Sequence, residues 1–181
     1  MRCFLAIECP EEIKDRLAEV QYELSLCGGL KAVEYENLHL TLKFLGEVDE
    51  TGLDRLKAVL DGVKASRYKI VVKGVGAFPN PGNPKVIWAG IGAGFDESIS
   101  LHEKVDTALL PLGFQPEERF HPHITLARVK GPTDGNRMEA LVESHSETAF
   151  GEYCVDGFAL MQSRLTPNGP TYTEIGRFRL G

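Results

Sequence analysis

Apolar and polar residues follow two periods along this chain: some segments alternate residue by residue, and others repeat apolar positions every three or four residues. Alternation is typical of half-buried strands, and the longer period of amphipathic helices. In the first half these patterns predict strands at 2–8, 37–45 and 68–77. They also predict a helix at 11–26, closed by Gly28-Gly29, and a second helix that Asp49 or Thr51 could cap.

The second half of the chain repeats this order of elements. Strands are predicted at 85–91, 121–129, 150–162 and 171–179, and helices at 96–110 and 134–144. Each half therefore reads as strand, helix, strand, helix, strand, although the halves share little sequence outside one short motif. We expect two similar lobes of strands and helices around a central cleft.

The shared motif lies on the middle strand of each half. It reads His39-Leu-Thr41-Leu in the first half and His123-Ile-Thr125-Leu in the second, and the histidines lie 84 residues apart in a chain of 181. Residues i and i+2 of a strand point to the same face, so the histidine and threonine of each motif share one face. The aliphatic residues share the other face, which belongs to a core. The polar face must then look at solvent, a cleft or a partner.

Two histidines and two threonines arranged in this way suit acid–base chemistry. Imidazole has a reference pKa of about 6.5, so one ring can accept a proton while the other, when charged, donates one. A threonine hydroxyl two residues along can donate to a non-bridging phosphate oxygen. The sequence shows no serine or cysteine elbow and no evident carboxylate cluster for Mg²⁺. These features predict metal-free hydrolysis of a phosphodiester by water.

Composition and charge narrow the class of protein. An apolar fraction of 43% and a charged fraction of 25% are those of an ordinary globular chain. The net charge of −6 argues against a broad basic surface for long nucleic acid, and leaves room for a local basic pocket. The start is too acidic for a secretory signal, and no apolar run approaches the ~20 residues of a membrane span. We expect a cytoplasmic protein without membrane contact, whose four cysteines are buried free thiols.

Further short segments accompany the motifs in an order that is specific when taken together. They are Arg2-Cys-Phe4-Leu-Ala-Ile, Asn37 to Glu47, Phe78-Pro-Asn-Pro, Val86-Ile-Trp88-Ala-Gly, Phe120 to Arg128, Gln162-Ser163-Arg164-Leu and Gly169-Pro-Thr-Tyr172. With them, nearly the whole chain resembles the 2H phosphoesterases, and within these the RNA 2′,3′-cyclic phosphodiesterases, also called LigT-like 2′-5′ RNA ligases. The resemblance implies a bilobal α+β fold whose histidines face each other across a cleft.

In this fold we expect a single bilobal domain over 1–181, with lobes at roughly 1–80 and 81–181 and terminal strands that can exchange between them. Each pseudo-symmetric lobe is expected to carry an antiparallel sheet with helices packed outside. The implied activity opens a 2′,3′-cyclic phosphate, at an RNA end or on a small cyclic nucleotide, to leave a 2′-phosphate. It implies no cofactor and no metal.

The resemblance also implies residue roles. His39 and His123 form the catalytic pair, Thr41 and Thr125 bind phosphate oxygens, and Arg128 lies at the site. The acid protonates O3′ while the base activates water; His39 as acid and His123 as base is our assignment, which the sequence leaves open.

Strand parity raises a difficulty for Arg128. Strict alternation puts it on the face opposite Thr125, so a bulge, a strand end or a long detour is needed for it to reach a phosphate. The alternative is an ion pair at the surface or between the lobes. Lys43 lies four residues after His39, so strict alternation places it on the same face as His39. Phe44, the first-half counterpart of Arg128, cannot bind phosphate.

Other candidates for binding are weaker. Phe44 and Tyr172 are expected to stack a nucleobase beside the cleft, as aromatic residues do with single-stranded RNA. His121 and His123 form an H-x-H pair, but no third metal ligand lies at a useful spacing, so His121 is expected to form hydrogen bonds near the site. The glycines at 90, 92 and 94 fail the spacing of a dinucleotide-binding loop.

Two alternatives to hydrolysis stay open. A 2′-5′ RNA ligase would use the same histidines in the reverse reaction, with a 5′-hydroxyl in place of water. A non-catalytic module would recognise the phosphate of an RNA end or nucleotide without turnover, although binding alone could use arginine or lysine in either histidine position. A monomer is the expected oligomeric state for a self-contained cleft.

Overall fold

The computed structural model describes residues 1–181 as four α-helices, nine strands and two short 3-10 helices. The strands are β1 (Arg2–Glu8), β2 (Leu30–Ala32), β3 (His39–Glu47), β4 (Tyr68–Phe78), β5 (Val86–Ile91), β6 (His123–Val129), β7 (Ala149–Val155), β8 (Gly157–Thr166) and β9 (Gly169–Arg179). The helices are α1 (Glu11–Ser25), α2 (Glu50–Asp61), α3 (Phe95–Leu109) and α4 (Gly135–Ser144), and the 3-10 helices are η1 (Tyr35–Asn37) and η2 (Leu110–Leu112).

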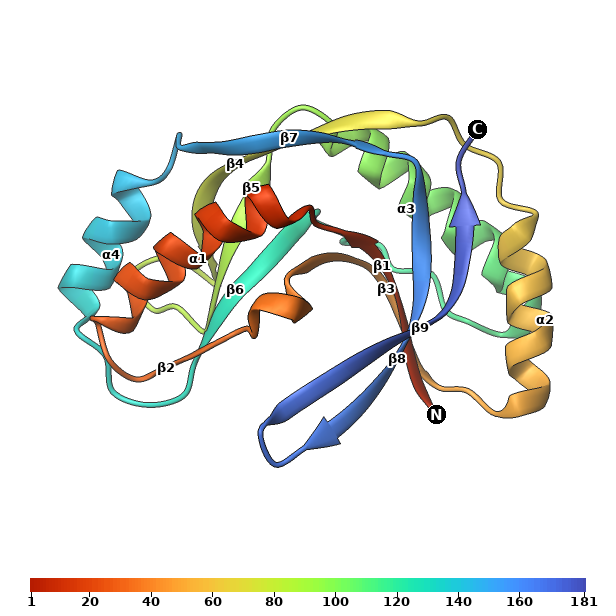
Figure 1. Ribbon diagram of the computed structural model, residues 1–181, viewed down its shortest axis with the longest axis horizontal. Coiled ribbons are helices and arrows are strands. Elements are labelled where there is room, and N and C mark those ends of the chain that lie inside the picture. Colours follow the sequence, from red (N-terminus) through yellow and green to blue (C-terminus); the bar gives the residue numbers. More distant parts are fainter.

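The strands form one curled sheet in which every pair is antiparallel (Figure 1). The order is β7-β4-β5-β6-β3-β1-β8-β9, and β2 pairs with β6 beside this path. Its two arms meet between β6 and β3, where a single residue pair, Leu40 with Ile124, joins them. The expected α+β, two-lobed architecture is therefore confirmed, with both lobes sharing one continuous sheet.

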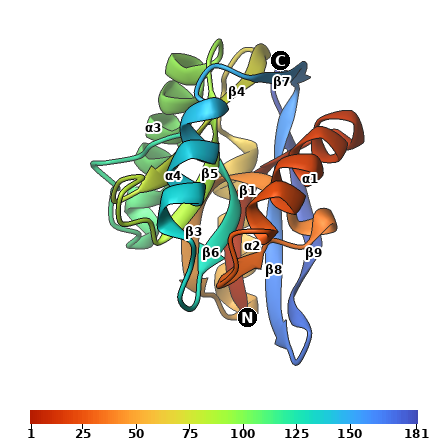
Figure 2. The same cartoon turned by 90° about the vertical axis from the view of Figure 1, so that its left-hand side faces the viewer.

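Each arm of the sheet carries a pair of helices. Helices α1 and α4 contact each other and lie against the arm of β4 to β7, while α2 and α3 pack together beside β9 and β3 (Figures 1 and 2). Apolar positions at helical spacing face inward: Leu17 in α1, Leu56 in α2 and Val105 in α3 are fully buried. They belong to one apolar cluster of 37 buried residues.

The chain crosses between the arms several times. Helix α1 follows β1 along the chain but packs near β7, in the opposite arm. Strand β4 precedes residue 80 yet pairs with β5 and β7, whereas β8 pairs with β1 and β9 pairs with β8. The pairing order thus runs across the expected boundary near residue 80, and the division of the chain into a single bilobal domain stays a prediction.

Most elements agree with the pattern of the sequence. Asp49, one of the two candidate caps, accepts a hydrogen bond from the backbone N–H of Gly52 at 2.6 Å and begins α2. The strand predicted over 150–162 is wrong in one respect, because it is two strands: β7 pairs with β4, and after Asp156 the chain joins β1 in the other arm. Strand β2 was not predicted, since three residues are too few for a period to show.

Two further observations bear on the expectations from composition. None of the four helices has the length and apolar character that a membrane span requires. Three of the cysteines are buried free thiols as expected, whereas Cys154, on the edge strand β7, is exposed.

Lys43 does not share the face of His39 and Thr41, so its expected position on that face is wrong. A β-bulge at Leu42 adds a residue to β3, because Leu5 and Ala6 of β1 face Lys43 and Thr41. Lys43 is turned to the buried side, where its Nζ lies 2.5 Å from Oδ1 of Asp106 in α3 and donates to the Gln115 carbonyl at 2.8 Å. The other Asp106 oxygen accepts from the backbone N–H of Glu117 at 2.7 Å. This ion pair joins β3, α3 and the segment that leads into β6.

We expect Lys43→Met to lower the free energy of unfolding by about 3–5 kcal/mol, because it removes the lysine that pairs with the buried Asp106 carboxylate and leaves as its only side-chain partner His102, whose Nε2 lies 3.2 Å from the other oxygen. Urea unfolding followed by circular dichroism measures the loss. Adding Asp106→Asn to Lys43→Met should restore part of the stability by removing the unpaired charge. The control Lys104→Met, at an exposed position of α3, should change the free energy of unfolding by no more than about 0.5 kcal/mol. A loss for Lys43→Met no larger than for this control would contradict the interpretation.

Candidate active site

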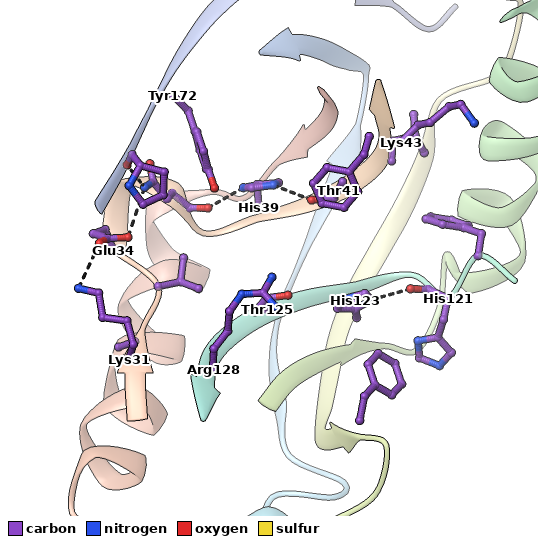
Figure 3. A pocket seen from close by; sticks show the side chains of 18 of the residues that line it. Lys31, Glu34, His39, Thr41, Lys43, His121, His123, Thr125, Arg128 and Tyr172 are labelled. Atoms are coloured by element: carbon purple, nitrogen blue, oxygen red, sulfur yellow. Dashed lines mark hydrogen bonds and ion pairs between the residues drawn. The ribbon is translucent and has the colours of Figure 1, made fainter. Parts of the chain in front are cut away.

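The two H-x-T motifs cross at their middle residues, where the arms of the sheet meet. Leu40 of β3 pairs with Ile124 of β6, and both are fully buried. In an antiparallel pair the neighbouring residues follow in opposite directions, so His39 comes on the side of Thr125 and Thr41 on the side of His123, and the two histidines lie diagonally across the pair. Figure 3 shows these four side chains on facing strands around one opening. The structure thus brings together all four residues that the motifs single out.

Each motif histidine is held by a backbone carbonyl two residues before it. Nδ1 of His39 donates to the Asn37 carbonyl at 2.5 Å, and Nδ1 of His123 donates to the His121 carbonyl at 2.6 Å. A carbonyl oxygen only accepts, so the proton of the neutral ring sits on Nδ1. Nε2 is then the nitrogen that can exchange a proton in the cleft. In His39 it accepts from the Thr41 hydroxyl at 2.8 Å.

Both histidines are less basic than free imidazole. Burial lowers the pKa of His39 below its usual 6.5 by more than the hydrogen bond to Asn37 raises it, and the charges of Lys14 and His123 lower it further. Burial likewise lowers the pKa of His123, against the bond to the His121 carbonyl, while His121 and Arg128 add to the effect. Both rings are therefore neutral near pH 7 in the free protein.

Aromatic side chains pack against each of these histidines. Phe4 stacks on the His39 ring with centroids 5.1 Å apart, and Tyr172 meets the same ring edge-on at 5.5 Å. Phe78 meets His123 edge-on at 5.4 Å. This packing accounts for the desolvation of the imidazoles and restricts their orientation.

Tyr172 reaches His39 from the far end of the chain. It lies at the start of β9, after the turn that links β9 to β8. The Asn37 side-chain amide donates to the Pro170 carbonyl at 2.8 Å and fastens this hairpin to the segment before β3. Asn37 therefore orients His39 through its carbonyl and Tyr172 through its side chain. Burial raises the pKa of the Tyr172 hydroxyl, so it is a neutral donor near the cleft.

A second β-bulge decides the position of Arg128. Ile87 and Trp88 of β5 face Ala127 and Thr125 of β6, so Leu126 is an extra residue in β6. The bulge reverses the alternation beyond it, and Arg128 comes to the face of Thr125 and His123 (Figure 3). A bulge is one of the three ways, expected from the sequence, in which Arg128 can reach a phosphate despite strict alternation.

The two bulges occupy the same place in their motifs. Leu42 and Leu126 each follow the motif threonine directly. The bulge in β3 brings Phe44 to the cleft face, as the bulge in β6 does for Arg128, and the Phe44 side chain is 70% exposed. The two halves therefore present an aromatic ring and a guanidinium at equivalent positions.

These residues line a cleft of about 540 Å³. Apart from Lys43, whose charge is paired with Asp106 on the buried side, its basic residues are Lys31, Arg119, Arg128 and Lys130, and its acidic residues are Glu34 and Glu117. A chain with a net charge of −6 thus gathers positive charge at this one place. The local basic pocket that the net charge leaves room for is present.

Comparison with known proteins agrees with the motifs and with the fold. A family model described as LigT like Phosphoesterase matches residues 7–88 and 93–172. This chain belongs to the LigT-like phosphoesterase family. Proteins named RNA 2′,3′-cyclic phosphodiesterase are 42% identical in Archaeoglobus fulgidus, covering 98% of this chain and 99% of the relative, and 40% identical in Methanocaldococcus jannaschii, covering 97% and 98%.

Solved structures of LigT-like phosphoesterases have the same two-lobed fold. A Thermus thermophilus protein superposes with a TM-score of 0.82 at 34% identity, covering 99% of this chain and 97% of that one. Escherichia coli LigT in complex with 3′-AMP superposes with a TM-score of 0.80 at 25% identity, over the same shares of the two chains. The resemblance inferred from the sequence is confirmed.

Some residues of the LigT-like cleft were not singled out from the sequence. Phe78 lines the cleft and contacts His123, because the register of β4 with β5 turns it to this face. Lys31 and Lys130 were missed because a lone lysine gives no signal without the pairing of β2 with β6.

The His121 ring packs among the aromatic rings of Phe78, Trp88 and Phe95. Its carbonyl oxygen, rather than its ring, is the group that accepts the hydrogen bond of His123. No group of three or more His, Cys, Asp or Glu side chains in the structure could hold a metal ion.

We expect the imidazoles of His39 and His123 to titrate below pH 6.5, because burial disfavours their charged forms. We also expect their neutral forms to carry the proton on Nδ1, since each donates to a carbonyl. Proton–nitrogen correlation spectra of the histidine rings, recorded across pH, measure both properties, and His39→Gln and His123→Gln assign the signals. Titration above 6.5, or a proton on Nε2 of the neutral ring, would contradict this geometry.

Proposed function

We propose that this protein hydrolyses the 2′,3′-cyclic phosphodiester of an RNA end or a nucleotide to a 2′-phosphate, using His39 and His123 as an acid–base pair. The observation that carries the proposal is the crossing of the two H-x-T motifs, which leaves two imidazole Nε2 atoms available to one cleft. Relatives at about 40% identity that bear the name RNA 2′,3′-cyclic phosphodiesterase support it. So do the structures of LigT with 3′-AMP and with phosphate.

In the proposed reaction, water attacks phosphorus in line with the P–O3′ bond. One histidine, neutral at Nε2, takes a proton from the water as the new P–O bond forms. The other, protonated at Nε2, gives its proton to O3′ as the P–O3′ bond breaks. The products are a 3′-hydroxyl and a 2′-phosphate, and the two histidines have exchanged protonation states. Their Nδ1–H bonds to the Asn37 and His121 carbonyls hold both rings in the required orientation.

The phosphate itself needs donors for its non-bridging oxygens. Thr41 and Thr125 lie beside the two histidines on the cleft face, and the bulge in β6 brings Arg128 to the same face. A phosphate oxygen that takes the hydrogen bond of the Thr41 hydroxyl frees Nε2 of His39 for proton transfer. The positive charge of Arg128 offsets the charge that builds on the phosphorane oxygens.

The terminal nucleoside has two aromatic partners. Phe44 is largely exposed at the lining of the cleft, and Tyr172 covers His39. We assign nucleobase stacking to these rings, since stacking is the common way of holding an unpaired base and tolerates different bases. A monomer remains the expected working form.

Replacing either His39 or His123 by alanine should reduce kcat at least about 10²-fold, the lower range for loss of a general acid or base. The assay is release of 2′-phosphate from cytidine 2′,3′-cyclic phosphate in the presence of EDTA. His145→Ala, outside the cleft at the end of α4, should leave the rate unchanged. Full activity in both cleft variants would refute the two-histidine mechanism. Native protein that binds without turnover would instead indicate a phosphate-binding module.

The His39→Ala and His123→Ala variants also show which histidine is the acid and which is the base, when O3′ of the substrate is replaced by sulfur. A thiolate, with a thiol pKa of about 8.5, leaves without a proton, so this substrate no longer needs the acid. With His39 as acid, His39→Ala should lose much less activity on the sulfur substrate than on the oxygen one. His123→Ala should lose the same on both. The reverse pattern would reverse the assignment.

The pH dependence of kcat/KM should be bell-shaped, with its maximum below pH 6.5. The base must be neutral and the acid charged, and burial lowers the pKa of both histidines in the free enzyme. Activity should therefore fall above pH 6.5 as the acid loses its proton, and fall again in more acidic solution as the base gains one. The two apparent pKa values belong to the coupled pair. Initial rates at low substrate from acidic to mildly alkaline pH test this, and a maximum in alkaline solution would contradict it.

A further inference from the structure

One end of the cleft carries a cluster of three cations, of which the proposed chemistry uses only Arg128. Lys31 of β2 pairs directly with Arg128 of β6, so the two side chains stand on the same face of the ladder. Lys130 follows Arg128 by two residues, and its backbone N–H donates to the Gly29 carbonyl at 2.8 Å beside β2. All three side chains are exposed and line the cleft. Arg128 and Lys31 lie beyond the second motif, on the side away from His121 (Figure 3).

Most of this positive charge is left unpaired. Lys31 lies 3.4 Å from Glu34, but none of the ion pairs in the structure includes Arg128 or Lys130. Like charges placed opposite each other on neighbouring strands destabilise a sheet. Their presence here, on a protein with a net charge of −6, points to an anionic ligand that passes over β2 and β6.

The opposite end of the cleft has a different character. There the lining comes from the segment before β6 and contains one cation, Arg119, and one carboxylate, Glu117, together with the ring of Phe120. The end formed by β2 and β6 holds three cations and one carboxylate. A chain of phosphates is therefore attracted to the β2 end and gains little at the other.

We propose that the RNA strand on the 5′ side of the terminal nucleotide leaves the cleft over β2 and the end of β6, with its phosphates against Lys31 and Lys130. This inference rests on the proposed function, because it places the cyclic phosphate between His39 and His123. Residues two apart on a strand are separated by about 6–7 Å, the scale on which phosphates recur along an extended nucleic acid strand. Arg128 then binds the cyclic phosphate, and Lys130 and Lys31 bind the phosphates on its 5′ side.

This path predicts a preference for oligonucleotides over mononucleotides. The test compares kcat/KM for cytidine 2′,3′-cyclic phosphate with kcat/KM for a trinucleotide that ends in the same cyclic cytidylate. In Lys31→Gln/Lys130→Gln the trinucleotide-to-mononucleotide ratio should fall about tenfold relative to native protein. The dependence of trinucleotide kcat/KM on salt should weaken by about 0.7 in logarithmic slope for each phosphate that no longer meets a lysine.

Two control variants separate this path from general electrostatics. Lys64→Gln/Lys104→Gln removes the same charge from exposed lysines that line a different surface hollow, and should leave the ratio unchanged. Arg119→Gln removes the cation at the other end of the cleft and should also leave it unchanged. A lower ratio in Arg119→Gln, with no change in the double lysine variant of the β2 end, would place the strand at the opposite end and overturn the inference.

Two further outcomes are decisive. Equal loss on both substrates in Lys31→Gln/Lys130→Gln would mean that these lysines serve the terminal phosphate or the fold, and would refute the strand path. If native protein cleaves neither substrate, the proposed function fails, and the path is judged by fluorescence anisotropy with the trinucleotide 2′-phosphate. Weaker binding in the double variant than in native protein would then support the path, and equal binding would refute it.

Discussion

The crossing of β3 and β6 at Leu40 and Ile124 is the constraint on which the rest of the site depends. Both residues are fully buried, so burial of their side chains fixes which face of each strand looks into the cleft. A shift of one residue in either strand would send a histidine into the core and an aliphatic side chain into the cleft. Because the arms of the sheet share only this pair, they can diverge on either side of it and leave an opening for substrate.

The β-bulges in β3 and β6 determine which side chains face the cleft as much as the regular alternation of the strands does. An extra residue directly after each motif threonine reverses the alternation, and so turns Phe44 and Arg128 to the cleft face while Lys43 goes to the buried side. The backbone symmetry of the halves therefore presents chemically different side chains at equivalent positions. One half can offer an apolar ring to a base, and the other a guanidinium to a phosphate.

Aromatic contacts and backbone hydrogen bonds act together on the two histidines. Aromatic contacts remove water from both imidazoles and lower their pKa values, whereas the Asn37 and His121 carbonyls retain the Nδ1 protons and the ring orientations. The segment before β3 and the β8–β9 hairpin are joined by the same Asn37, so segments from both ends of the chain close over the His39 ring. The positive charge of the cleft comes from residues that are remote from each other in the sequence.

The sequence alone determined the order of the elements, the two strand motifs with a core face and a polar face, and the family, because these depend on local periodicity and on short segments in a characteristic order. It also predicted the partnership of His39 and His123. Only the tertiary structure decided the faces of Lys43 and Arg128, the end of β7 at Val155, the strand β2 and the cluster of Lys31 with Lys130. The physical reason is that bulges and register are set by pairing with neighbouring strands, and the energy of that pairing is not encoded within the strand itself.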